Sequence, residues 1–229
     1  MPYRQKISMD NSIYDILLGL PLFQGLSKTE FEQILSKVRL EFSTVQAGVT
    51  FVNAGEQCGN FVFILKGNVT SRRSTADGRL TLIEHIDAPL FIEPYSMFGM
   101  RPVYCKSYTA VTTTGILRID KQYLYSELYK YNTCRMSLLN LLSGRIQALE
   151  ADKWDLRGTT LRERMAKLLG TLSDNPAALC QVIVRMEDLA EILGETRLNV
   201  SKALNALQAE GRITLRRGAI TVLPTATQK

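Results

Sequence analysis

The chain has 229 residues, of which 45% are hydrophobic, so it is long enough to bury one large core or two smaller ones. A formal net charge of +6 favours a polyanionic partner, although charge alone does not specify one. The N-terminal sequence MPYRQKISMD lacks the apolar run of a signal peptide, and no segment is apolar over the width of a bilayer. We therefore expect a cytoplasmic protein with no membrane partner. The cysteines Cys58, Cys105, Cys134 and Cys180 form no C-x-x-C pair, which argues against a disulfide framework and against a zinc site.

The N-terminal half predicts helices followed by a barrel of short strands. The segments SIYDILLGLPLF and SKTEFEQILSKV read as two helices, with Pro21 and Gly25 marking the break between them. From Gly48 to about Asp120, glycines separate the β-rich runs VTFV, FVFIL, LTLIEHI and GILRI. Regularly spaced short strands with glycine turns are typical of an antiparallel sandwich or barrel, and such a barrel can hold a small ligand.

The composition excludes one class of enzyme built on such a barrel. Cupin-type metal sites need several imidazoles around the metal, and this sequence contains one histidine, His85, on a predicted strand. We interpret His85 as an ordinary strand residue rather than a haem or metal ligand. We expect no catalytic site, no metal site and no enzymatic activity.

A long helix is predicted from about Asn132 to Leu156. Its apolar residues follow a three-four spacing that forms a heptad seam, in which Lys153 takes the one missing place: Leu139, Leu142, Ile146, Leu149 and Leu156. Because a seam of this kind needs a partner helix, we expect a homodimer interface at Leu139, Leu142, Ile146 and Leu149. The alternative is a single buried helix within a monomer.

A domain boundary follows this helix. Gly158 interrupts the pattern, and Thr160 with Glu163 forms a capping box that begins the next helix. We place a hinge near 157–159, which divides the chain into a sensor at 1–157 and a second domain at 158–229.

The second domain contains two short helices joined by a tight turn. Met186, Leu189, Ala190 and Leu193 lie on one helical face, and Gly194 ends that helix. A second helix begins after Thr196, a suitable N-cap, and runs to about Gly211. Its buried face is formed by Val200, Ala203, Leu204 and Leu207. This spacing predicts a helix-turn-helix.

The outer face of the second helix carries residues that can read DNA: Arg197, Leu198, Asn199, Ser201, Lys202 and Asn205. Arg197 or Lys202 can reach guanine or phosphate, Asn205 can bind adenine, and Leu198 can contact a thymine methyl. A solvated helix surface is the alternative interpretation.

A hairpin follows in the sequence RITLRRGAITVLP. Ile213 and Leu215 alternate toward a turn at Arg216, Arg217 and Gly218, after which the chain returns through residues 220–222. A hairpin directly after a helix-turn-helix makes a winged helix. Arg216 and Arg217 then lie where a wing can meet the phosphate backbone.

This order of parts resembles the Crp/Fnr family of bacterial transcription factors over nearly the whole chain. The resemblance is carried by PLFQGLSKTEFEQI, by AGVTFVNAGEQCGNFVFILKGNVTSRRSTADGR and, most specifically, by EDLAEILGETRLNVSKALNALQAEGRI. It implies a homodimer that binds a palindromic site in double-stranded DNA, under the control of a ligand or redox state in the barrel. RNA polymerase is a further candidate partner.

The sequence departs from the family in the cyclic-nucleotide cassette. The family's Phe-Gly-Glu turn reads FIEP here, so Glu93 is retained while Ile92 replaces the glycine and Pro94 removes a donor N–H. The family's arginine-serine pair falls on Tyr104-Cys105 or on Lys106-Ser107, neither of which supplies a bidentate guanidinium. These changes argue against cyclic AMP and leave an unknown acidic effector open, with candidate pocket residues Glu93, Cys105, Lys106 and Ser107.

Two further departures concern redox sensing and DNA specificity. No cysteine precedes Cys58, which argues against the iron–sulfur cluster of the oxygen-sensing branch. Leu198 stands where the family commonly has a glutamate that accepts from cytosine, so we expect a changed consensus site.

We predict an α+β protein: an antiparallel β-roll with flanking helices, a long dimerisation helix and a C-terminal winged helix-turn-helix. The predicted function is sequence-specific transcriptional regulation. The rival is a ligand-binding module that regulates a protein partner through the winged helix.

Overall fold

A computed structural model describes residues 11–20, 22–37, 39–128, 130–154, 160–173 and 178–224. Pro21, Leu156 and the expected hinge at 157–159 lie outside these ranges, so the boundary at 157/158 stays a prediction. We call residues 11–154 the sensor and residues 160–224 the head. Among the helices of the described ranges, none has the length and hydropathy needed to cross a bilayer.

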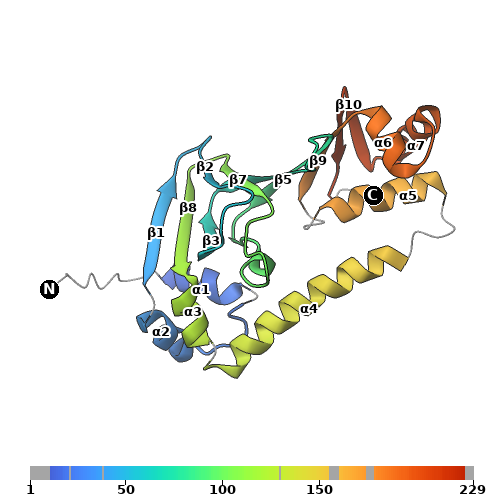
Figure 1. The fold of residues 1–229 in the computed structure, drawn as a ribbon. Coiled ribbons are helices and arrows are strands. Elements are labelled where there is room, and N and C mark those ends of the chain that lie inside the picture. The colour runs from blue at the N-terminus through green and yellow to red at the C-terminus, as the bar shows by residue number, and fades with distance from the viewer. Residues whose placement is uncertain are drawn as a thin grey trace.

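The sensor is an antiparallel β-roll, as the glycine-punctuated runs predict (Figure 1). One sheet has the strand order β1–β8–β3–β6, formed by β1 (Leu40–Val45), β8 (Thr114–Asp120), β3 (Asn60–Lys66) and β6 (Leu90–Phe91). The opposing strands are β2 (Thr50–Val52), β4 (Asn68–Ser74), β5 (Leu80–Asp87) and β7 (Ser107–Ala110), and a short 3-10 helix, η1 (Pro94–Ser96), precedes β7.

Aromatic side chains fill the β-roll and attach the N-terminal helices α1 (Asn11–Gly19) and α2 (Lys28–Lys37). The ring centroids of Phe63 and Phe91 lie 4.5 Å apart, and Phe23, between α1 and α2, lies 5.8 Å from Phe63. Gly67 joins β3 to β4 with φ 101°, and a Cβ there would lie 2.9 Å from the carbonyl oxygen of Thr113. Only glycine fits this turn, because both the positive φ and the close approach exclude a side chain.

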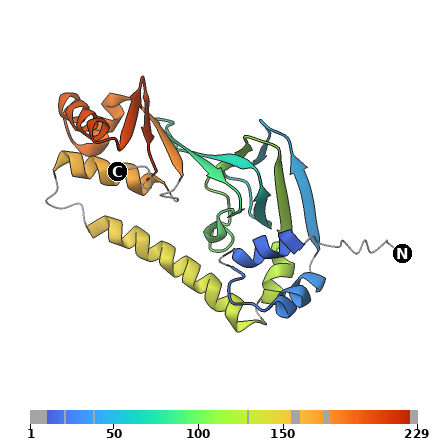
Figure 2. The ribbon, with the colours of Figure 1, turned by 180° about the vertical axis from the view of Figure 1, so that it is seen from behind.

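Two further helices complete the sensor, α3 (Lys121–Leu128) and α4 (Asn132–Trp154). In both views α4 runs from the N-terminal helices toward the head (Figures 1 and 2). Buried Cys134 and half-buried Leu138 pack against the sensor core, and the Arg145 guanidinium lies 5.7 Å from the ring centre of Tyr95. One face of α4 therefore packs against the rest of the sensor.

The head contains α5 (Leu161–Leu172), β9 (Leu179–Val184), α6 (Met186–Leu193), α7 (Arg197–Ala209), β10 (Ile213–Arg216) and β11 (Ala219–Val222). The predicted capping box is present, since Glu163 N donates to Thr160 Oγ1 and Thr160 N donates to Glu163 Oε2. Strand β9 was not predicted from the sequence.

Strand β9 joins the head to the sensor in one sheet. It pairs with β11 on one edge and with β5 on the other, giving the seven-strand order β10–β11–β9–β5–β4–β7–β2. The β5–β9 ladder runs from Leu80 opposite Val184 to His85 opposite Leu179. Figure 2 shows β5 reaching from the β-roll to the head.

The hydrophobic core of the head includes residues of the sensor. Leu80 and Leu82 of β5 are 9% and 4% exposed and belong to the same buried cluster as Val182, Leu204 and Ile220 of the head. Burying two leucines contributes on the order of 3–6 kcal/mol to the free energy of unfolding, so sensor and head share a hydrophobic core rather than a surface contact.

Candidate nucleic-acid interface

The α6–α7 turn has the geometry of a helix-turn-helix. Gly194 ends α6 in the left-handed region with φ 65°, and Glu195 N donates to the carbonyl oxygen of Ala190 at 3.0 Å. Thr196 then caps α7, because its Oγ1 accepts from Asn199 N at 3.2 Å. These local bonds set the angle between the helices, and the predicted face of α7, with Val200 at its centre, is buried against the core of the head.

The six residues predicted to face DNA gather on the other side of α7. The Leu198 side chain is 64% exposed, Lys202 and Asn205 are exposed, and Ser201 is half-buried. Arg197 and Asn199 are also exposed but have acidic neighbours. Arg197 Nη1 lies 3.0 Å from Glu187 Oε1, and Asn199 Nδ2 donates to Glu195 Oε2 at 3.3 Å. The side chain of Arg197 must therefore leave a surface ion pair, worth little in water, to reach a base.

The hairpin has the predicted register, with Ile213 opposite Val222 and Arg216 opposite Ala219. Gly218 makes the turn with φ 70°. Arg216 and Arg217 are exposed at its tip, and neither guanidinium pairs with a carboxylate in the described part of the chain. Two uncompensated cations at a hairpin tip can bind phosphate oxygens.

Sequence reasoning predicted α6 from Met186 but missed an ion pair at its start. Arg185 Nε lies 2.6 Å from Asp188 Oδ2, and Arg185 Nη2 donates to Asp188 Oδ1 at 3.0 Å. This hydrogen bonding holds the pKa of the Asp188 carboxyl below its ordinary value. The spacing of an arginine three residues before an aspartate at a helix start was the available signal.

Comparisons with known proteins agree with this geometry. Residues 163–226 match the family described as "Crp-like helix-turn-helix domain". The head is a Crp-like helix-turn-helix domain. A CRP-like cAMP-activated global transcriptional regulator of Mycobacterium tuberculosis is 24% identical over 213 residues, covering 88% of this chain and 91% of that protein.

Solved structures show the same fold. The Thermus thermophilus catabolite activator protein matches with a TM-score of 0.53 and 22% identity, over 90% of this chain and 95% of that chain. The sensor domain of the regulator DNR from Pseudomonas aeruginosa matches with a TM-score of 0.52 and 21% identity, over 63% of this chain and 95% of that chain. The predicted fold class and the resemblance to Crp/Fnr regulators are confirmed. The relative is a transcriptional regulator and not an enzyme, in agreement with our prediction for this chain.

The predicted effector residues lie around the loop between η1 and β7, away from the Crp-like head's DNA face. Glu93 is buried with φ 36°, and its carboxylate accepts from Ser96 Oγ at 2.7 Å and from the backbone N of Cys105 and Lys106 at 2.7 and 2.9 Å. These bonds compensate for the unfavourable backbone conformation. Ser107 Oγ instead accepts from the backbone N of residue 54 at 2.9 Å. Glu93 therefore organises this loop with the protein's own donors.

Lys106, one of the candidate pocket residues, forms a buried ion pair within the protein. Its Nζ contacts Glu84 Oε2, and the two side chains are 3% and 1% exposed. Glu84 also accepts from Ser71 Oγ and Ser173 Oγ, both at 2.8 Å. Burial alone would raise the pKa of Glu84, but the Lys106 ammonium and the hydrogen bonds from Ser173 and Ser71 outweigh it and lower the pKa. Since Ser173 follows α5, this cluster connects the sensor to the Crp-like head.

The predicted dimer residues form an apolar stripe on α4. The exposed fractions are 56% for Leu139, 60% for Ile146 and 46% for Leu149, while Leu142 is half-buried. Leu139, Ile146 and Leu149 are exposed, whereas Cys134 and Leu138 of the same helix pack against the sensor core. Such a row of exposed large apolar side chains is unusual on a monomer surface.

The cysteines and histidine assemble no metal site within the described ranges, where no cluster of three or more His, Cys, Asp or Glu residues has suitable geometry. Burial raises the pKa of Cys58 and Cys180 to about 12 and that of Cys134 to about 11. These three thiols stay protonated near neutral pH, so they are poor metal ligands and nucleophiles.

Proposed function

We propose that the chain is a homodimeric, sequence-specific transcriptional regulator that places α7 of each subunit in the major groove of a palindromic DNA site. The main observation that supports this proposal is the outer face of α7, where Leu198, Lys202 and Asn205 are exposed to solvent. In this arrangement the two helices read half-sites roughly one helical turn, about 34 Å, apart.

Each residue of the interface has a distinct role in this proposal. Lys202 and Arg197 bind guanine or phosphate, Asn205 binds adenine, and Leu198 packs on a thymine methyl. The wing tip, with its two exposed arginines, contacts the phosphate backbone next to the groove. Base contacts determine which DNA sequence is bound, whereas the wing adds affinity that decreases as the salt concentration rises.

The apolar stripe of α4 forms the dimer interface in this proposal. Two copies of the stripe, packed as a heptad seam around a two-fold axis, would bury Leu139, Ile146 and Leu149. The symmetry of the dimer then matches the symmetry of a palindromic site.

We infer that a small molecule bound in the β-roll controls this activity, since the M. tuberculosis relative is named as cAMP-activated. The internal pairing of Lys106 with Glu84 and the hydrogen bonds that engage Glu93 argue against cyclic AMP bound in the usual manner.

Selection of random-sequence DNA by the purified protein at near-physiological salt tests the proposal. We expect an enriched palindrome, from which the half-site spacing is read directly. Lys202→Ala should then weaken binding to that palindrome by about 1–3 kcal/mol, with a much smaller effect on random DNA. Lys66→Ala is the matched control, because it removes the same charge from an exposed position of β3.

Two outcomes would contradict parts of the proposal. Equal weakening of cognate and random DNA by Lys202→Ala would leave Lys202 as a phosphate contact. Recovery of no motif, both without ligand and with a metabolite extract, would favour the rival function, in which the winged helix binds a protein.

A further inference from the structure

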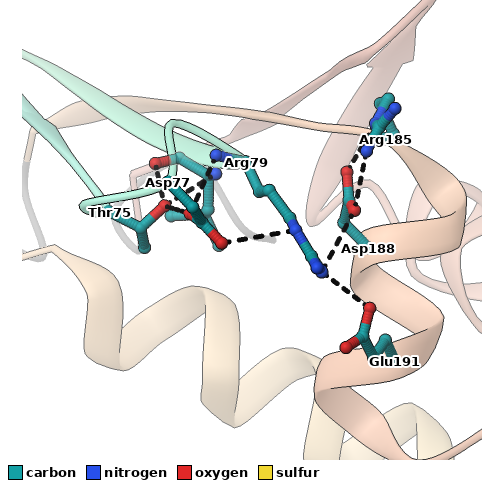
Figure 3. A network of polar contacts seen from close by, with 7 residues as sticks. Thr75, Asp77, Arg79, Arg185, Asp188 and Glu191 are labelled. Carbon is teal, nitrogen blue, oxygen red and sulfur yellow. Dashed lines mark hydrogen bonds and ion pairs between the residues drawn. The ribbon is translucent and has the colours of Figure 1, made fainter.

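The β4–β5 hairpin of the sensor is built into the Crp-like head. Strand β5 extends the sheet of the head through its ladder with β9, and Leu80 and Leu82 complete the core of the head. The turn of this hairpin, residues 75–79, then lies beside α6, the first helix of the helix-turn-helix (Figure 3).

Arg79 connects this turn to α6 by several ionic contacts. Its Nη1 lies 2.6 Å from Glu191 Oε2 and 3.5 Å from Asp188 Oδ1. Figure 3 marks both contacts with dashed lines. Asp188 is only 5% exposed and is also held by Arg185, so the contact reaches a carboxylate that is fixed in the head.

The turn that presents Arg79 is itself held in shape. Asp77 accepts from Thr75 Oγ1 at 2.6 Å and from Arg79 N at 3.1 Å, and Arg79 Nε lies 3.3 Å from Asp77 Oδ2. The guanidinium is therefore oriented by its own hairpin before it meets α6. A preorganised guanidinium of this kind loses less conformational freedom on contact than a flexible surface side chain does, so it orients α6 better.

Docking of the hairpin leaves the DNA-facing groups exposed. Arg79 contacts α6, whereas Leu198, Lys202 and Asn205 on α7 stay at the surface. The hairpin turn and the wing turn both line one open hollow of about 480 Å³, which includes Asp77, Arg79 and Arg217. Arg217 is exposed there and is not paired with the hairpin in the described structure.

We propose that the β4–β5 hairpin positions the helix-turn-helix for DNA, so that the head binds its site while still paired with β5, and that Arg79 is the positioning residue for α6. This inference rests on the proposed DNA-binding function. Separation of the head would expose Leu80 and Leu82 and break the β5–β9 ladder, whereas the docked head already presents both α7 and the wing.

A disulfide lock across the ladder tests whether the head stays docked. Ile83 of β5 lies opposite Gln181 of β9, and both are half-buried. Directly opposed residues of antiparallel strands are close enough for a disulfide. The variant Ile83→Cys/Gln181→Cys, made in a Cys105→Ser background, is compared in its oxidised and reduced forms by fluorescence anisotropy on the selected palindrome.

We expect the two forms to bind with affinities within about twofold, because the lock holds an arrangement that DNA binding already uses. A loss of more than about tenfold on oxidation, reversed by a reductant, would overturn the inference, since the head would then have to leave β5 to bind. Absence of DNA binding by the unmodified protein would instead overturn the proposed function, and this inference with it.

A charge exchange tests Arg79 itself. Arg79→Glu should weaken binding to the palindrome by about fivefold or more, because it sets a carboxylate against Asp188 and Glu191. Arg79→Glu combined with Glu191→Arg should restore most of the affinity, which a general loss of positive charge cannot explain.

Arg73→Glu is the control for the charge exchange, because Arg73 is exposed on the same hairpin and makes no ion pair in the described structure. We expect it to have little effect. Equal weakening by Arg73→Glu, or no rescue by the exchange, would refute a positioning role for Arg79.

Discussion

Replacement of Leu82 with alanine tests whether the sensor completes the core of the Crp-like head. Leu82 belongs to β5 but is 4% exposed within the cluster that includes Val182 and Leu204. Removing a buried leucine side chain costs about 2–5 kcal/mol, because transfer free energy is lost and a cavity remains. At the lower limit, about 2 kcal/mol raises the population of the opened head roughly 30-fold.

Amide hydrogen exchange of the full-length protein, followed by mass spectrometry, measures this opening. We expect Leu82→Ala to accelerate exchange in α5, α6 and α7, although the substituted residue lies in the sensor. Leu117→Ala is the matched control, because Leu117 is fully buried in the sensor core and loses the same atoms. Faster exchange confined to strands of the β-roll in both variants would show that the head has a core of its own, and the reasoning would be wrong.

Three further predictions concern the wing, the dimer and the buried ion pair. Arg216→Ala and Arg217→Ala should each reduce the slope of log affinity against log salt by about one unit, and an unchanged slope would show that the wing does not touch DNA. Ile146→Glu should shift the protein from dimer to monomer in analytical ultracentrifugation and weaken DNA binding, since it places a charge in an apolar seam; a dimer that persists would exclude this stripe as the interface. Because the pKa of Glu84 is lowered in the folded protein, its contribution to the free energy of unfolding is present above its ordinary value and is lost as pH falls through its folded value. Urea unfolding between about pH 5 and pH 3 should therefore show a shallower pH dependence for Glu84→Gln/Lys106→Met than for the natural chain, and equal slopes would contradict the lowered pKa.

Local signals in the sequence predicted much of the head. The helix-turn-helix was predictable because its determinants are short-range: the apolar spacing of α6 and α7, the positive φ of Gly194 and the cap at Thr196. The wing followed in the same way from the alternation around Gly218. The position of the DNA-facing side chains on α7 then follows from helical geometry alone.

Long-range pairing was not predictable from these signals. Strand β9 is short and ends directly before α6, so its alternation of buried Cys180, Val182 and Val184 was overlooked. Even with β9 recognised, periodicity shows which face of a strand is buried and not which strand pairs with it. The contact of Arg79 with Glu191 depends on that pairing, and the residues that flank Arg79 and Glu191 in the sequence do not indicate it.

The effector residues show the same limit. The resemblance made Lys106 one candidate pocket residue, which stays a prediction, and the structure pairs Lys106 with Glu84 on β5. A lysine side chain is long enough to serve either partner, so the choice depends on which carboxylate the fold brings near. That carboxylate is distant in sequence and invisible to motif comparison.

The sharing of β5 between the two halves has a consequence for how the chain is made and recombined. The sensor is synthesised first, so its hairpin can be in place as an edge on which β9 and the wing assemble when the head emerges. A head cut from the chain between residues 154 and 160 and fused to a foreign sensor would lack both this edge and the two leucines that close its core. The unit that can be exchanged between regulators of this kind is therefore the head together with its hairpin, although the two are far apart along the gene.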